Sequence, residues 1–336
     1  MKEKTVMRRI QIILQSTVPL LLLAATIQPA ASAAAAADYP NRPIRMVVPQ
    51  GIGASNDTMA RVLTVKLGEV LGQQVVVDNR PGAGGMIGLE IASHAAADGY
   101  TLLGTATAIQ VISPQLYKKL SFDPFRDLTP IALYAITQNA LTVNPSMPVK
   151  TVREFIAAAK AAPGKLNMAS AGAGSQSHLA GMQFALPTGI DVVHIPYKGG
   201  GASVAAVVAN ESQFTLTPLP AVYSFIKSGR LRVLATGGEK RSPQLPDVPT
   251  VAEAGVPGFQ STGWAGLLAP HATPAPILGK VHAALIKVMN QPDTRELIER
   301  QGADPVTSTP AEFGRFIREE WDRFGQAIKA AKIKVE

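Results

Sequence analysis

The chain of 336 residues has no cysteine, and aromatic residues make up only 5% of it. The absence of cysteine excludes disulfides, thiolate catalysis and zinc–sulfur sites. The chain is 46% apolar and 17% charged, an ordinary balance for a globular protein, and its length is enough to bury a sizeable core. We therefore expect a globular protein of about two domains that folds without covalent cross-links.

Motifs for metal, acyl and nucleotide chemistry are also missing. The five histidines do not fall into H-E-x-x-H or a similar spacing, and the sequence around Ser175 lacks the G-x-S-x-G of a nucleophile elbow. Ile87 stands where a dinucleotide loop needs its third glycine, and no glycine-rich turn carries a Walker lysine. We therefore expect no metal site, no cofactor and no bound nucleotide.

Ser175 and His178 leave one enzymatic alternative open. A serine and a histidine at this spacing could act as the nucleophile and base of a secreted hydrolase. Residues this close together at a helix start more often cap the helix. We therefore expect the chain not to be an enzyme.

Residues 1–37 have the pattern of a secretory signal peptide. A start with four lysine and arginine residues precedes the apolar run Ile10–Ile27, and small residues then offer cleavage sites between about Ala33 and Asp38. An uncleaved membrane anchor is the alternative, but Pro19 and polar residues interrupt the run. No second apolar stretch approaches the roughly 20 residues that a membrane span needs. We expect an exported protein.

The net charge is mildly basic. Loss of the leader removes four positive charges and one negative charge, so the net charge falls from +8 to +8 − 3 = +5. The remaining lysine and arginine residues are scattered, without a run interleaved with aromatic residues, so nucleic acid is not an expected partner. A mild positive field favours the approach of an anionic small molecule.

Beyond the leader, predicted strands and helices alternate, which favours α/β domains with parallel sheets. The apolar run Ile44–Val48 predicts a buried strand, and apolar residues at helical spacing predict a helix over residues 58–71. Two further apolar runs follow, Ile131–Ile136 and Ala140–Val143. We expect the chain to pass between two domains near Gln138.

Three glycine-rich turns, Pro49–Asp57, Asn79–Gly85 and Ser170–His178, each join a predicted strand to a predicted helix. Unpaired N–H groups at a helix start lie at the positive end of its dipole, which suits an anion. Another turn, Gly104–Thr107, carries two hydroxyls after the predicted strand Tyr100–Leu103. Ligands bind outside the carboxyl ends of strands in open α/β sheets. Turns from two domains would thus face each other across a cleft that closes by a hinge motion.

A series of short strings recurs in consistent order along the mature chain. They are Val48-Pro49, Gly53, Asp57, Ala60-Arg61, Asn79-Arg80-Pro81-Gly82-Ala83-Gly84-Gly85, Asp98-Gly99-Tyr100-Thr101-Leu102, His178-Leu179-Ala180-Gly181, His194-Ile195-Pro196-Tyr197-Lys198-Gly199, Arg241-Ser242-Pro243, Leu245-Pro246-Asp247-Val248-Pro249-Thr250, Glu253-Ala254-Gly255, Trp264 and Gly266-Leu267. In this order and spacing the chain resembles the periplasmic solute-binding proteins of tripartite tricarboxylate transporters, also called the Bug or TctC family.

The resemblance implies an α/β protein of two domains with the periplasmic-binding-protein type II (Venus flytrap) fold and a ligand cleft between the lobes. Lobe 1 would comprise residues 38–138 plus 261–336, and lobe 2 residues 139–260. It implies a periplasmic receptor, expected to be a monomer, that captures a small organic anion and delivers it to membrane transporter subunits. A receptor for a membrane signalling sensor is the alternative.

The resemblance also assigns the ligand contacts to particular turns. Gly51–Asp57 and Ser170–His178 would hold the ligand from the two lobes, partly through ordered water, with Asp57 either capping its helix or orienting a ligand group. The Tyr197–Gly199 turn and the strand end at Thr217 would line the pocket. The expected ligand-binding residues are Gly51, Ile52, Gly53, Ala54, Ser55, Asp57, Ala83, Gly84, Gly85, Thr105, Thr107, Ser170, Gly172, Gly174, Ser175, His178, Tyr197 and Thr217.

The chain departs from the family pattern at several of these positions. The first turn commonly reads Pro-Phe-Pro-Pro-Gly-Gly, whereas here Gln50, Ile52 and Ala54 interrupt that pattern. Met182 and Thr217 stand where many members have glutamate and aspartate. Loss of potential acids from the cleft disfavours an amino group on the ligand. We therefore expect a plain or aromatic carboxylate rather than an amino acid.

Overall fold

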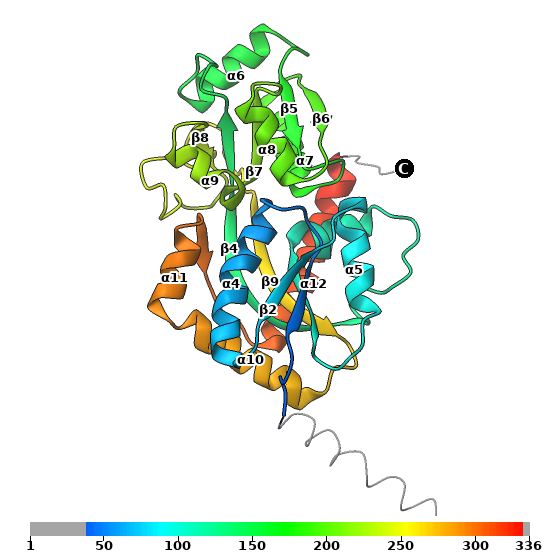
Figure 1. Ribbon diagram of the computed structural model, residues 1–336. Coiled ribbons are helices and arrows are strands. Elements are labelled where there is room, and N and C mark those ends of the chain that lie inside the picture. Colours follow the sequence, from blue (N-terminus) through cyan, green and yellow to red (C-terminus); the bar gives the residue numbers. More distant parts are fainter. Residues whose placement is uncertain (1–37, 332–336) are drawn as a thin grey trace, which may run out of the picture.

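Residues 38–331 are described in the structure, a computed structural model, and the expected signal peptide and its cleavage site lie outside them. The elements form two lobes connected by the long strand β4 (Leu128–Val143), which runs from one lobe into the other (Figure 1). Among the described residues, no helix combines the length and the apolar character needed to cross a membrane.

The remaining elements alternate along the chain. The other strands are β1 (Ile44–Val48), β2 (Val75–Asn79), β3 (Thr101–Ala106), β5 (Asn167–Ser170), β6 (Val193–Pro196), β7 (Phe214–Pro218), β8 (Arg232–Thr236), β9 (Thr262–Pro270) and β10 (Ala303–Pro305). The α-helices are α4 (Ser55–Leu71), α5 (Met86–Ser93), α6 (Val152–Ala161), α7 (Gln176–Thr188), α8 (Gly200–Val208), α9 (Leu219–Lys227), α10 (Ala275–Met289), α11 (Pro292–Glu299) and α12 (Pro310–Ala331). Short helical turns are η1 (Ala83–Gly85), η2 (Ala108–Ile112) and η3 (Ser113–Gln115).

Each lobe is built on a mixed sheet. In lobe 1, β1 pairs in parallel with β2 and β3, whereas β9 runs antiparallel to β3 and β4, and β10 antiparallel to β4. In lobe 2, β5 is parallel to β6 and β7, and β4 runs antiparallel to β7 and β8. The prediction of parallel sheets is therefore wrong for the strands next to β4. Because β4 takes the chain out of lobe 1 and β9 brings it back, these two strands run in opposite directions.

Strand β4 belongs to both sheets. Its residues up to Gln138 pair with β9, and those from Asn139 onward pair with β7 and β8. The two apolar runs of the sequence thus lie in one continuous strand. The polar residues between them are bonded in place, since Gln138 Oε1 accepts from Gly238 N at 3.1 Å and Asn139 Nδ2 donates to Ser261 Oγ at 2.6 Å.

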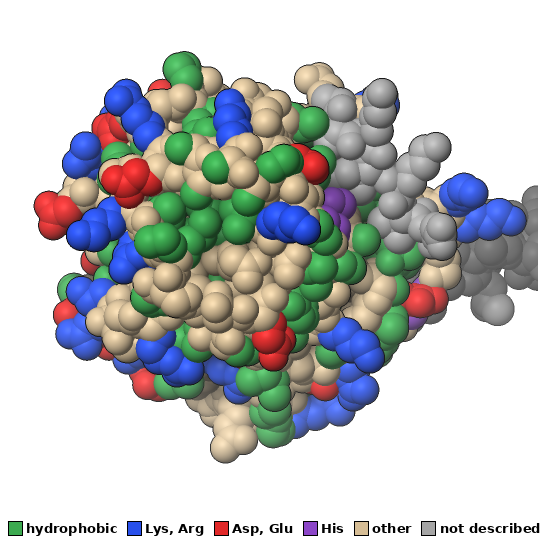
Figure 2. All heavy atoms as spheres, turned by 90° about the horizontal axis from the view of Figure 1, so that it is seen from above, with side chains coloured by type: hydrophobic (Ala, Val, Ile, Leu, Met, Phe, Trp, Pro, Cys, Tyr) green, Lys and Arg blue, Asp and Glu red, His purple; other side chains and the backbone are tan. Residues whose placement is uncertain are grey.

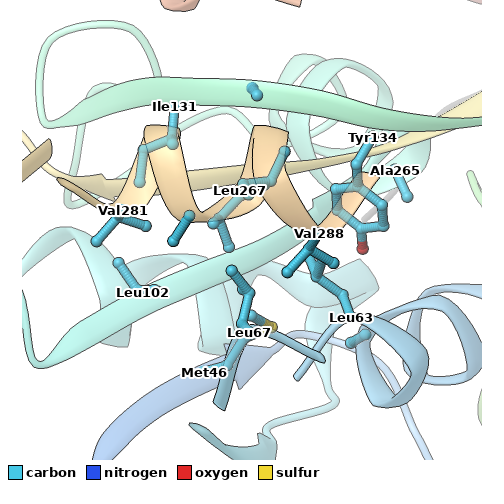
Figure 3. Packing of buried hydrophobic residues seen from close by; sticks show 14 of the residues in the cluster. Met46, Leu63, Leu67, Leu102, Ile131, Tyr134, Ala265, Leu267, Val281 and Val288 are labelled. Atoms are coloured by element: carbon cyan, nitrogen blue, oxygen red, sulfur yellow. The ribbon is translucent and has the colours of Figure 1, made fainter. Parts of the chain in front are cut away.

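The sheet of lobe 1 is apolar on both faces, as a sheet covered by helices on both sides must be. On one face Met46 packs with Leu63 and Leu67 of α4 and with Val281 of α10 (Figure 3). Val47, the next residue along β1, belongs to the cluster on the opposite face with α5 and α12. The predicted strand Ile44–Val48 is confirmed residue for residue.

The aromatic stripe of the last helix is core packing, as its spacing predicts. Phe313, Ile317 and Phe324 of α12 are buried in the cluster that also contains Trp264 and Leu268 of β9, and the rings of Trp264 and Phe313 lie 5.4 Å apart between centroids. Lobe 2 repeats the plan, with one cluster under α6 and α7 and another under α8 and α9. These layers fix the strand ends from which the site is built.

Candidate functional site

A cavity of about 510 Å³ lies between the two lobes. Turns from lobe 1 and lobe 2 supply its walls, which consist of Pro49, Gln50, Gly51, Pro81, Gly82, Ala83, Gly84, Gly85, Ala108, Ser113, Tyr117, Ala171, Gly172, Ala173, Ser175, Tyr197, Lys198, Gly199 and Gly200. A smaller space of about 30 Å³ shares five of these residues and adds Ala54, Ser55, Ala106, Gln176, Ser177, Thr217, Pro218 and Ala221. We call the two spaces together the cleft.

Five helices begin at the walls of the cleft. Their N-cap residues are Ala54 of α4, Gly85 of α5, Ser175 of α7, Gly199 of α8 and Pro218 of α9, and each lines one or both cavities. Only Ser175 among these five caps its own helix with its side chain. A helix start carries a partial positive charge and unpaired N–H groups, so the convergence favours a bound anion.

The first turn is held in shape by a buried carboxylate. Asp57 is 2% exposed, and its oxygens accept from Gly53 N at 2.9 Å, Asn79 Nδ2 at 2.9 Å and Arg61 Nε at 3.0 Å. Burial opposes ionisation of Asp57, but the bonds from Arg61, Gly53 and Asn79 outweigh it and hold the pKa of the carboxyl below its usual value. Asp57 does not line the cleft, and it uses the N–H of Gly53.

The other residues of this turn divide between the cleft and the solvent. Gly51 lines the larger cavity, and Ala54 and Ser55 line the smaller one. Ile52 is 75% exposed and is not part of either wall. Gln50, one of the departures from the family pattern, lines both cavities, and its Oε1 accepts from Asn56 N at 3.3 Å.

All three predicted contact residues of the second glycine-rich loop lie on the wall of the larger cavity. Ala83, Gly84 and Gly85 all line it and all have positive φ, at 48°, 65° and 98°. A Cβ atom on Gly84 would lie 2.9 Å from Ser113 Oγ, which donates to the Gly84 carbonyl at 2.8 Å. The close approach of Ser113 therefore requires glycine at this position.

The structure does not bring Thr105 and Thr107 to the cleft. The predicted turn is wrong at Thr105, because β3 continues through Ala106. Both threonines are fully buried: the Thr105 hydroxyl lies 3.4 Å from Gln110 Oε1, and the Thr107 hydroxyl accepts from Trp264 N at 2.8 Å. These hydroxyls hold β9 and η2 in place.

In the third turn, Gly172 and Ser175 line the cleft, whereas Ser170, Gly174 and His178 support it from behind. Ser175 Oγ accepts from the backbone N of His178 at 3.3 Å, and His178 Nδ1 accepts from Gly174 N at 3.1 Å. The Ser175 hydroxyl therefore acts as a helix cap, and the histidine ring is bonded to the turn.

A second histidine, which the sequence does not connect with this turn, stacks on the first. The rings of His178 and His194 are parallel at a centroid distance of 3.8 Å, and His194 Nε2 lies 2.6 Å from the buried hydroxyl of Ser170. Burial, together with the neighbouring His194, lowers the pKa of His178 to about 4. Burial also lowers the pKa of His194. Both rings are therefore neutral at physiological pH.

Two further predicted residues line the cleft from lobe 2. Tyr197 forms part of the larger cavity and holds its hydroxyl 3.0 Å from Ser212 Oγ, and Thr217 lines the smaller space at the end of β7. Sequence reasoning missed Ser113 and Tyr117. They follow β3 in an irregular segment that carries no periodic pattern, so only the folded chain places them opposite lobe 2.

The charge on the described lining of the cleft is of one sign, positive. Among the described residues that line it, Lys198 is the one with a charged side chain, and no aspartate or glutamate is present. On the face of lobe 2 that Figure 2 shows, basic side chains are interspersed with acidic ones rather than gathered in one patch. Among residues 38–331, no cluster of three or more histidine, cysteine, aspartate or glutamate side chains is placed to hold a metal ion.

The two lobes meet in backbone contact beside the cleft. A Cβ atom built on Gly201 of α8 would lie 2.8 Å from the carbonyl oxygen of Ile52, and one on Gly200 would lie 3.5 Å from the Ala54 side chain. Gln176, which lines the smaller space, donates to Asn139 Oδ1 at 3.3 Å at the point where β4 passes between the sheets. Residues of the cleft in lobe 2 thus contact both the first turn of lobe 1 and the part of β4 that joins the lobes.

Comparison with known proteins gives consistent matches over most of the chain. The family model described as "Tripartite tricarboxylate transporter family receptor" (TctC) matches residues 59–333. Protein BugT of Bordetella pertussis (strain Tohama I) is 36% identical over 299 residues, covering 89% of this chain and 92% of BugT.

Solved structures agree with the fold. The R. palustris protein Rpa4515, solved with adipate, matches with a TM-score of 0.86 and 31% identity, covering 88% of this chain and 99% of that one. MatC from Rhodopseudomonas palustris, solved with bound malate, matches with a TM-score of 0.80 and 31% identity over 86% of this chain and 100% of that one. The two-lobe fold expected from the sequence is confirmed.

Proposed function

The chain belongs to the tripartite tricarboxylate transporter receptor (TctC) family, and from this premise we propose that it binds a small organic carboxylate in the cleft and delivers it to a transporter of that type. Adipate and malate, bound by two solved relatives, are both small dicarboxylates. We further propose that the protein acts in the periplasm as a monomer and performs no catalysis.

The convergence of five helix starts on a cleft whose described lining residues include no acidic side chain carries this proposal. We assign the first carboxylate of the ligand to these helix starts, with Ser55 from lobe 1 and Gly172, Ser175 and Thr217 from lobe 2. Backbone N–H groups and hydroxyls bind an anion through hydrogen bonds without reacting with it.

The same composition supports a ligand without an amino group. An ammonium group would need an acidic partner, and Thr217 stands at the lining position where many family members have aspartate. The residue limits of the lobes are part of the proposal: residues 38–138 plus 261–336 for lobe 1, and 139–260 for lobe 2. The change of partners along β4 after Gln138 supports this division.

A thermal-shift panel tests the proposed function. Ligand at 100 times its Kd adds about 3 kcal/mol of stability, which raises Tm by several degrees. We expect this shift with simple or aromatic carboxylates and none with aspartate or glutamate. Stabilisation by the amino acids alone would refute the assignment of the ligand class.

A matched pair of variants ties the binding to the cleft. Ala173 is exposed and lines the larger cavity, so Ala173→Trp fills that space without disturbing the core. Ala161 is also exposed on lobe 2 but belongs to α6, away from the cleft. Ala173→Trp should abolish the shift and Ala161→Trp should keep it.

A further inference from the structure

Among the described residues that line the cleft, Lys198 is the one with a charged side chain. It lines the larger cavity but not the smaller, and its side chain is exposed. Ser55 and Thr217, which belong to the proposed anion site, line only the smaller space. Lys198 and these two hydroxyl-bearing residues therefore line different parts of the cleft.

Much of the remaining wall of the larger cavity is apolar and neutral. Pro49, Ala108, Ala171 and Ala173 contribute small apolar surfaces, and Tyr117 adds an aromatic ring from lobe 1. None of these side chains carries a charge at neutral pH. An anionic group beyond the first would therefore find an oppositely charged side chain at Lys198.

The backbone holds Lys198 in a defined turn. Tyr197 N donates to Ser170 O at 2.9 Å, and Gly199 N donates to Tyr197 O at 2.9 Å. Gly199 has a φ of 103°, which favours glycine and ends the turn at the start of α8. The base of the lysine is thus fixed, while its flexible stem leaves the ammonium free to reach an anion.

From this arrangement we infer that Lys198 is a specificity-determining residue, which selects ligands bearing a second anionic group in addition to the first carboxylate. This inference rests on the proposed function, because it takes the first carboxylate to be held at the helix starts. A dianion with an apolar middle segment places one anionic group at the helix starts and the other at the Lys198 ammonium, whereas a monoanion of equal length leaves the ammonium unpaired.

Matched acids measure this selection directly. Adipate and hexanoate both have six carbon atoms, but adipate has two carboxylates and hexanoate has one. Terephthalate and benzoate provide the corresponding aromatic pair. Isothermal titration of the full mature chain should show the dianion of at least one pair binding about tenfold more tightly, as expected for a charge-assisted hydrogen bond. The preference should shrink at high salt.

Variants of Lys198 separate a charge contact from a structural role. Lys198→Met keeps the apolar stem and should reduce the preference for the dianion to about twofold or less, because it weakens binding of the dianion more than binding of the monoanion. Lys198→Arg keeps the charge and should retain the preference. Lys165→Met, at an exposed lysine of lobe 2 outside the cleft walls, is the matched control and should behave as the unmodified protein.

Each outcome decides between the two proposals. Equal affinities for the acids of both pairs, or an unchanged preference in Lys198→Met, would overturn the role of Lys198 and leave carboxylate binding intact. Weaker binding of both acids by the same factor in Lys198→Met would indicate a structural role and also overturn it. If no acid of the panel binds at all, the proposed function itself fails together with the inference.

Discussion

Replacing Gly201 with alanine tests whether the lobes must come together for the ligand to bind. Gly201 lies in α8 without a positive φ, so alanine is compatible with its backbone and raises helix propensity by about 0.5–1 kcal/mol. The added Cβ would lie 2.8 Å from the carbonyl oxygen of Ile52 in the other lobe. The substitution therefore favours lobe 2 by itself and opposes the contact between the lobes.

The magnitude follows from the crowding. Inserting a methyl group into a well-packed contact typically costs about 1–3 kcal/mol, and the backbone carbonyl of Ile52 cannot rotate away as a flexible side chain could. Relief requires the lobes to separate, which weakens hydrogen bonds from both sides of the cleft. At about 1.4 kcal/mol per tenfold, we expect Gly201→Ala to weaken ligand binding by about 5- to 100-fold.

Titration calorimetry with the most stabilising carboxylate, together with urea unfolding of the ligand-free protein, measures both effects. Gly279 of α10 has open space at its Cβ position, so Gly279→Ala is the control for a helical glycine replacement. Unchanged affinity in Gly201→Ala would refute the reasoning, because the ligand would then bind without this contact between the lobes.

The remaining predictions concern the third turn. Because the pKa of His178 is about 4 in the folded protein and about 6.5 in an unfolded chain, the unfolded chain binds more protons between these values. The free energy of unfolding should therefore fall by at most about 3 kcal/mol as pH is lowered from 6.5 to 4. His178→Asn, which keeps an acceptor for Gly174 N but does not titrate, should flatten this dependence in urea titrations at several pH values, and an unchanged slope would contradict the assignment. Ser175→Ala removes a helix cap and should cost about 1 kcal/mol of stability and lower ligand affinity. Neither it nor the unmodified protein should hydrolyse a nitrophenyl ester, and turnover lost in Ser175→Ala would instead support a hydrolase.

Local patterns predicted those parts of the molecule in which neighbouring residues determine the outcome. The strand Ile44–Val48 and the stripe on α12 were readable because apolar spacing reflects burial against a helix or sheet. The glycine-rich turns were readable because a positive φ or a close backbone approach demands glycine, as at Gly84. Most of the predicted contacts lie on the cleft walls, namely Gly51, Ala54, Ser55, Ala83, Gly84, Gly85, Gly172, Ser175, Tyr197 and Thr217.

Features that depend on tertiary contacts were not readable in the same way. The passage between the domains near Gln138 was predicted, but the partners that hold Gln138 and Asn139 there, Gly238 and Ser261, lie in distant segments. The hydroxyls of Thr105 and Thr107 suggested ligand contacts, but their partners Gln110 and Trp264 N take them into the core. A polar side chain at a strand end can either contact a ligand or bond within the core, and the packing of other segments decides which of the two occurs.

Native mass spectrometry of protein purified without refolding, and then mixed with the carboxylate panel, tests the central claim most directly. The unmodified protein and Ala161→Trp should each carry one small organic acid per monomer, and Ala173→Trp should carry none. No bound acid on the unmodified protein, or equal occupancy in Ala173→Trp, would contradict the claim that the cleft between the lobes is a carboxylate site.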